Sequence, residues 1–168
     1  MRSHLCLIVF VLIALAMLSA QSGCDNQPGL RDVSQRVVNV DETDEAMNAA
    51  IAKAKKTFYL FEKNWQNTDV EEFSIKLAME TESDGLEHIW FTPIKIADGQ
   101  ITATCANDPE GIPELQFGDV RTVDQSKVSD WMIMAGGKCY GGYTIRVLSE
   151  QDPANAPPLE FADFPQAP

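Results

Sequence analysis

The feature that most constrains the fold is a change in the spacing of apolar residues between positions 65 and 73. Before it, apolar side chains recur every three or four residues, which places them on one face of an α-helix. After it, they recur at every second residue through residue 80, which is typical of a strand with one buried face. This switch predicts a helix packed on a sheet. The helical face consists of Met47, Ile51, Ala54, Phe58, Phe61 and Trp65.

The helix is expected to begin after Thr43, whose hydroxyl can accept a hydrogen bond from the first turn. Turn signals such as Asp98-Gly99 and Gly136-Gly137 divide the later chain into strands. Residues 142–150 fit either a strand or a short closing helix, and we favour the helix. The predicted fold class is α+β: a mostly antiparallel curved sheet of about five strands, packed by one long N-terminal helix. The predicted strands span residues 73–80, 86–96, 101–105, 118–123 and 131–134.

The N-terminus has the pattern of an export signal. Arg2 precedes an unbroken apolar run at residues 5–18, and small residues follow up to Cys24. As a helix this run would span about 21 Å, less than the roughly 30 Å of a hydrocarbon core, so an uncleaved anchor is disfavoured. Cleavage before Cys24 would let acyl chains on that cysteine hold the protein at a membrane. Cleavage after Ser22 would release a soluble periplasmic or secreted protein, and we favour the lipoprotein.

Changes in composition along the sequence divide the chain into four parts. Residues 1–23 form the signal peptide, and the polar residues 24–41 form a flexible linker. Residues 42–150 form the α+β domain. The proline-rich residues 151–168 are expected to be a disordered tail, with Phe161 or Phe164 as the candidates for a contact with the domain.

Charge and cysteine content narrow the functional classes. The formal net charge of −12 repels phosphates, which excludes nucleic acid as a partner. In an oxidising compartment Cys105 and Cys139 can pair, and we favour a disulfide over two separately buried thiols.

Several short motifs, taken in order, resemble the DUF2314 family of YegJ-like bacterial proteins. The resemblance covers residues 42–148 and implies a single domain. It implies no activity, because the family has none established. The motifs are the helix at residues 47–61, Glu87–Trp90, Asn107–Pro109, Gly118–Val120, Asp130–Met132 and Gly141–Arg146.

The candidate binding residues are aromatic, charged and imidazole side chains within these motifs. His88 shares a strand face with Trp90, and we expect it to be hydrogen-bonded to a carboxylate such as Glu87 or Asp84. Tryptophan, tyrosine and arginine dominate interface hot spots. The candidates are Glu87, His88, Trp90, Asp130, Trp131, Tyr143 and Arg146.

A pair between Asp130 and Arg146 could line a recognition surface or lock the fold, and we favour the lock. Cys139, His88 and Asp130 could form a nucleophile, a base and its orienting acid, but nothing in their spacing requires this. One histidine with scattered acids lacks paired ligand spacing, so we expect no metal and no cofactor. Gly141-Gly142 lacks the remainder of a phosphate loop and predicts a turn.

Two functions remain open. We favour an exported, membrane-tethered, non-catalytic binding module of the cell envelope, with an unknown protein or peptide as its partner. The alternative is an envelope hydrolase that uses His88 with Cys139 or an acidic partner.

Overall fold

The computed structural model describes residues 44–164. The predicted signal peptide, the linker and the lipidation residue Cys24 lie outside the described residues, so they stay predictions. Among the described residues, no helix is both long enough and apolar enough to cross a bilayer.

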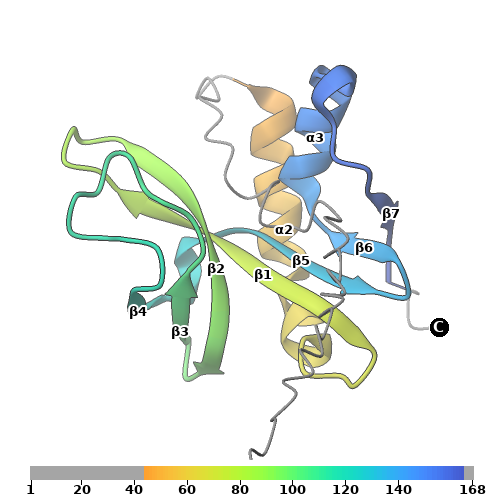
Figure 1. Ribbon diagram of the computed structural model, residues 1–168, viewed down its shortest axis with the longest axis horizontal. Helices are drawn as coiled ribbons and strands as arrows, with labels where there is room; N and C mark the ends of the chain where they lie inside the picture. The colour runs from red at the N-terminus through yellow and green to blue at the C-terminus, as the bar shows by residue number, and fades with distance from the viewer. Residues whose placement is uncertain (1–43, 165–168) are drawn as a thin grey trace, which may run out of the picture.

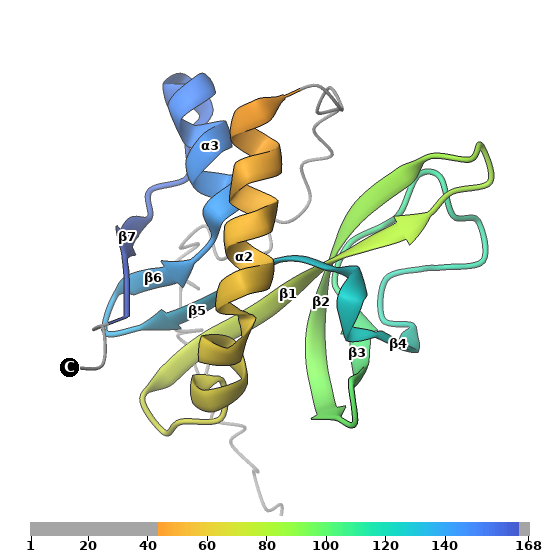
Figure 2. The same ribbon diagram turned by 180° about the vertical axis from the view of Figure 1, so that it is seen from behind.

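The long helix is α2, Glu45–Asn64. Its N-cap is Asp44 rather than Thr43: the helix begins one residue later than predicted, and the Asp44 carboxylate accepts a hydrogen bond from Met47 N at 3.0 Å. The predicted apolar face is confirmed, except that Ile51 is only half-buried. In Figure 2 this helix lies across the sheet in front of β1 (Val70–Glu80) and β5 (Val128–Ala135).

The sheet has seven strands in the order β4-β3-β2-β1-β5-β6-β7. All neighbours are antiparallel except β6 and β7, which are parallel. Its β2-β3-β4 half curls away from α2 (Figure 1). The remaining elements are β2 (Leu86–Ala97), β3 (Gln100–Cys105), β4 (Val120–Asp124), β6 (Lys138–Gly141), α3 (Tyr143–Gln151), β7 (Glu160–Ala162) and two single turns of 3-10 helix, η1 (Gln125–Lys127) and η2 (Pro153–Asn155).

The α+β class and the C-terminal helix α3 are confirmed, but the count of five strands is too low. Gly136 and Gly137 do not end the sheet. With φ of 57° and 72°, they turn the chain between the paired residues Ala135 and Lys138 into β6.

The described part of the C-terminal segment, residues 151–164, is packed on the sheet rather than disordered, and both Phe161 and Phe164 make the contacts expected of them. Within it, β7 pairs with β6, and the Phe164 ring stacks on Tyr140 with centroids 4.4 Å apart. Phe161 and Phe164 pack against the buried core, and burial of their apolar surface favours this position of residues 160–164 on the sheet.

The two cysteines within residues 44–164 do not pair with each other. Cys105 on β3 and Cys139 on β6 are both free and buried. Three strands separate β3 from β6, so the two residues lie on the order of 19 Å apart along the sheet. A disulfide requires Cα atoms within about 7 Å. The predicted bridge is therefore wrong, and the alternative of two buried thiols is correct.

Candidate functional site

Asp130 on β5 is completely buried and is the centre of the predicted residues. Its carboxylate accepts hydrogen bonds from Tyr143 N at 3.1 Å, Thr144 N at 2.8 Å and Thr144 Oγ1 at 2.6 Å, and also from Trp131 N at 2.8 Å. The N-cap residue of α3 is Gly142, which has no side chain to do this. Asp130 thus acts as a cap supplied by the sheet and fixes the start of α3.

A buried lysine completes this arrangement. Lys76 is directly opposite Asp130 on β1, and its Nζ donates to Thr144 Oγ1 at 2.8 Å. The ammonium also lies 4.7 Å from the centre of the Trp90 ring. Burial lowers the pKa of Lys76 and raises that of Asp130, while their mutual attraction opposes both shifts. We call these four residues, Lys76, Trp90, Asp130 and Thr144, the Lys76 cluster.

His88 lies at the exposed rim of this cluster on β2. Its Nδ1 is 2.8 Å from Ser129 Oγ, and Ser129 in turn donates to Lys76 O at 3.2 Å. The predicted carboxylate partner was wrong, because a bulge in the β1–β5 pairing places the Ser129 hydroxyl beside the ring. Partial burial of the imidazole, followed by the charges of Lys76 and Lys55, lowers the pKa of His88. The imidazole is therefore neutral at pH 7.

Glu87 holds a loop. Its two carboxylate oxygens accept hydrogen bonds from Glu110 N and Gly111 N, each at 2.9 Å. Glu87 pairs with Met79 on β1, whereas Asp130 pairs with Lys76 three residues away. Side chains alternate along a strand, so Glu87 and Asp130 lie on opposite faces of the sheet. These two carboxylates therefore cannot act together on one substrate.

Arg146 does not pair with Asp130, contrary to the prediction. Its guanidinium donates to Gly141 O at 3.0 Å and to Ala162 O at 2.7 Å, and it forms an ion pair with Asp163 at 3.3 Å. Arg146 therefore locks the fold, as we favoured, but it does so by tying α3 to the C-terminal strand.

The predicted aromatic residues mainly support packing. Trp131 is fully buried, and its Nε1 donates to Ala54 O on α2 at 3.1 Å. Tyr143 packs edge-on against it with ring centroids 5.8 Å apart. Trp90, Trp131 and Tyr143 are 3%, 0% and 6% exposed, so they offer little surface to a partner.

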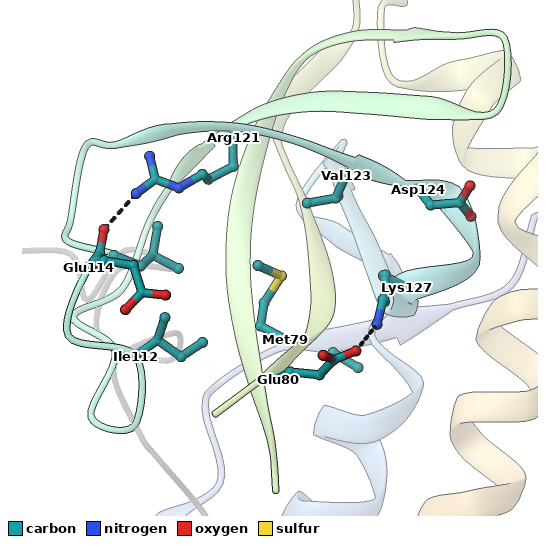
Figure 3. Close-up of a pocket in the computed structure, with 10 residues that line it drawn as sticks. Met79, Glu80, Ile112, Glu114, Arg121, Val123, Asp124 and Lys127 are labelled. Carbon is teal, nitrogen blue, oxygen red and sulfur yellow. Dashed lines mark hydrogen bonds and ion pairs between the residues drawn. The ribbon is translucent and has the colours of Figure 1, made fainter. Parts of the chain in front are cut away.

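A cavity of about 350 Å³ lies away from these residues. Figure 3 shows it between the end of β1, the loop around residues 112–115 and strand β4. Two contacts bridge its rim: Lys127 Nζ to Glu80 Oε1 at 2.8 Å, and Arg121 Nη2 to Glu114 O at 2.6 Å. Its apolar lining consists of Ala78, Met79, Ile112, Leu115 and Val123, and its polar lining of Glu80, Glu114, Arg121, Asp124 and Lys127.

Neither the cavity nor the burial of Lys76 was predicted from the sequence. Lys76 alternates with Ile75 and Leu77, a pattern that normally assigns a lysine to the solvent face. It is only 9% exposed, because both faces of the central strands are covered. The cavity residues come from β1, β4, η1 and a loop, and nothing in their spacing along the chain predicts that they meet. Among residues 44–164, no three His, Cys, Asp or Glu side chains are placed to hold a metal ion.

Comparison with known proteins identifies the class. Residues 44–156 match the family described as an uncharacterized protein conserved in bacteria (DUF2314), and this chain belongs to that family. The resemblance found in the sequence is therefore confirmed.

Two relatives illustrate the family. The chain is 31% identical to the uncharacterized protein YegJ of Escherichia coli, over 71% of this chain and 78% of that protein. It is 30% identical to a putative ankyrin repeat protein of Neisseria meningitidis serogroup B, over 67% of this chain and 48% of that protein. No solved structure matches this chain.

Proposed function

We propose that this protein is a non-catalytic binding module of the bacterial cell envelope, held at a membrane by lipid on Cys24. The apolar run at residues 5–18, which ends shortly before a cysteine, supports export. The net charge of −12 supports a protein or peptide partner over nucleic acid.

The observation that carries the binding role is the contrast between the cavity and the polar interior. The side chains best suited to chemistry are committed to contacts that hold elements together, whereas the cavity is lined by five apolar and five polar or charged residues. A pocket of 300–1,000 Å³ with a few polar groups is the usual form of a binding site.

The hydrolase alternative has weaker support. Burial raises the pKa of the Cys139 thiol to about 12, so it stays protonated near neutral pH and is a poor nucleophile. Strands β1 and β5 separate His88 on β2 from Cys139 on β6. The hydroxyl that contacts the imidazole belongs to Ser129, and this residue is only 1% exposed, so a substrate could not reach it.

Fractionation and affinity measurements test the proposal. We expect the protein in the membrane fraction and its Cys24→Ala variant in the soluble envelope fraction. A partner isolated from envelopes should bind His88→Ala and Cys139→Ser variants within about twofold of the original affinity, which is less than about 0.5 kcal/mol. Recovery of a cytosolic chain that still carries Met1 refutes the envelope role. Turnover that is lost in His88→Ala at an unchanged melting temperature establishes the hydrolase instead.

A further inference from the structure

Strand β4 forms one edge of the sheet, with β3 as its single strand neighbour in the described chain. Cys105 N donates to Asp119 O and Gln125 N donates to Gly99 O, each at 2.8 Å. Along an antiparallel strand, every second residue directs its backbone N–H and C=O to the same neighbour, so the odd-numbered residues from 119 to 125 bond to β3. The backbone N–H and C=O of Thr122 therefore point away from β3, toward the free edge.

A second strand edge borders the same cavity. The pairing of β1 with β5 ends at Leu77 and Val128. Beyond it, residues 78–80 pair with β2 on one side, and on the other they line the cavity. Arg121 and Val123 of β4 line it from across, as Figure 3 shows. The curled β4-β3-β2-β1 segment thus leaves a gap between two strand edges, and the cavity, with its apolar and charged lining residues, lies in this gap.

The charges around the gap favour a cationic occupant. Both cations of the rim are already engaged: Lys127 with Glu80 at 2.8 Å, and Arg121 with Asp119 at 3.2 Å. Glu114 and Asp124 add negative charge to the same rim. A second copy of this chain would bring another −12 of formal charge, and the two copies would repel each other.

We propose that an extended basic peptide adds to the free edge of β4 and places an apolar side chain in the cavity. This inference rests on the proposed binding role and names its partner class. Side chains of the added peptide would alternate between the two faces of the sheet. The peptide side chains next to Arg121 and Val123 would lie on the same face as these two residues and would enter the cavity. Main-chain bonds to Thr122 would supply affinity, while the pocket would select the side chain.

The test uses the full chain and a synthetic probe. The probe is an acetylated seven-residue peptide in which lysine alternates with valine or leucine, and its binding is followed by fluorescence anisotropy. Two comparison peptides separate the contributions: one has N-methyl groups on the backbone nitrogens that would face β4, and the other has glutamate in place of lysine. We expect each change to weaken binding at least tenfold.

Matched variants of one residue locate the contact. Thr122→Pro removes the outward N–H while leaving the β3 pairing intact, because proline is tolerated at a strand edge whose N–H faces outward. Thr122→Val keeps that N–H and, like the proline variant, loses the hydroxyl contact with Thr102 Oγ1 at 2.9 Å. We expect at least tenfold weaker binding for Thr122→Pro and less than a twofold change for Thr122→Val.

Amide exchange provides a test that needs no variant. In the original protein, the probe should slow exchange at the Thr122 amide, whereas the Val123 amide is already protected by β3. Equal binding of the N-methylated probe overturns the inference. So does binding by a folded Thr122→Pro variant equal to that of Thr122→Val, or a Thr122 amide that is protected without peptide. A cytosolic location would refute the envelope role alone, because the probe would still bind in vitro.

Discussion

Replacing Asp130 with alanine is the most direct test of how the sheet holds α3. The substitution removes the acceptor for Tyr143 N, Thr144 N and Thr144 Oγ1, and it leaves the buried Lys76 ammonium without its counter-charge. A hydrogen bond to a charged group contributes about 1.5–3 kcal/mol, and such contributions within one network are not additive.

The expected loss follows from the burial. The Thr144 hydroxyl bridges Lys76 and Asp130, and removing one of two buried opposite charges costs up to about 3–5 kcal/mol. We therefore expect the free energy of unfolding of Asp130→Ala to fall by about 3–5 kcal/mol, a large share of the roughly 5–15 kcal/mol typical of a domain. Guanidinium unfolding followed by tryptophan fluorescence measures this change, since the Trp131 ring lies in the core next to the cap.

Two further variants make the measurement specific. Glu71→Gln changes an exposed carboxylate on β1 and should alter stability by less than about 0.5 kcal/mol. The double variant Lys76→Met/Asp130→Ala should be less destabilised than the sum of its single changes, because the unpaired ammonium is gone. A loss below about 1 kcal/mol for Asp130→Ala, or full additivity with Lys76→Met, refutes the role assigned to the Lys76 cluster.

Three other expectations follow from single positions. Gly141→Ala would put a Cβ against the backbone oxygen of Trp131 and 2.6 Å from its ring, at φ +77°. Thermal melts should therefore show a larger loss of stability for Gly141→Ala than for Gly136→Ala, whose Cβ would meet nothing and whose positive φ should cost about 1–2 kcal/mol. Equal losses in the two variants would contradict this. Peptide mass spectrometry without reductant should find Cys105 and Cys139 alkylated only after unfolding; a linked peptide would contradict the free thiols. Hydrogen bonds from Gln151 and from the first turn of α2 hold the pKa of Asp44 below its ordinary value. The contribution of Asp44 to the stability of the fold is therefore present above about pH 4 and is lost as the pH falls through the lowered pKa. Asp44→Asn should therefore show a shallower acid decline in melting temperature, and an unchanged decline would argue against it.

Local sequence patterns predicted the elements that carry their own signal. The apolar face of α2 shows a clear 3.6-residue period. Asp98-Gly99, with φ of 54° and 72°, forms the predicted two-residue turn between β2 and β3. Strands β6 and β7 are only four and three residues long. Segments so short show too few alternations to be recognised by their period.

The candidate site was predicted less well, for a physical reason. Asp130, His88 and Arg146 make specific contacts within the fold, but with partners other than those predicted, and their role in binding stays a prediction. Their actual partners, such as Thr144 and Ser129, depend on where α3 starts and on a bulge in the β1–β5 pairing. A partner's identity depends on geometry between elements, which residue spacing does not encode.

By itself, the sequence determined the α+β class, the long helix, the first strands and the family, because each follows from the order of neighbouring residues. Only the tertiary structure decided that Lys76 is buried, that the two cysteines stay apart and that a cavity opens beside β4. These properties depend on how the sheet curls and on which distant segments cover each face. Burial is a property of the packed whole, and a strand's own pattern cannot specify what will cover its second face.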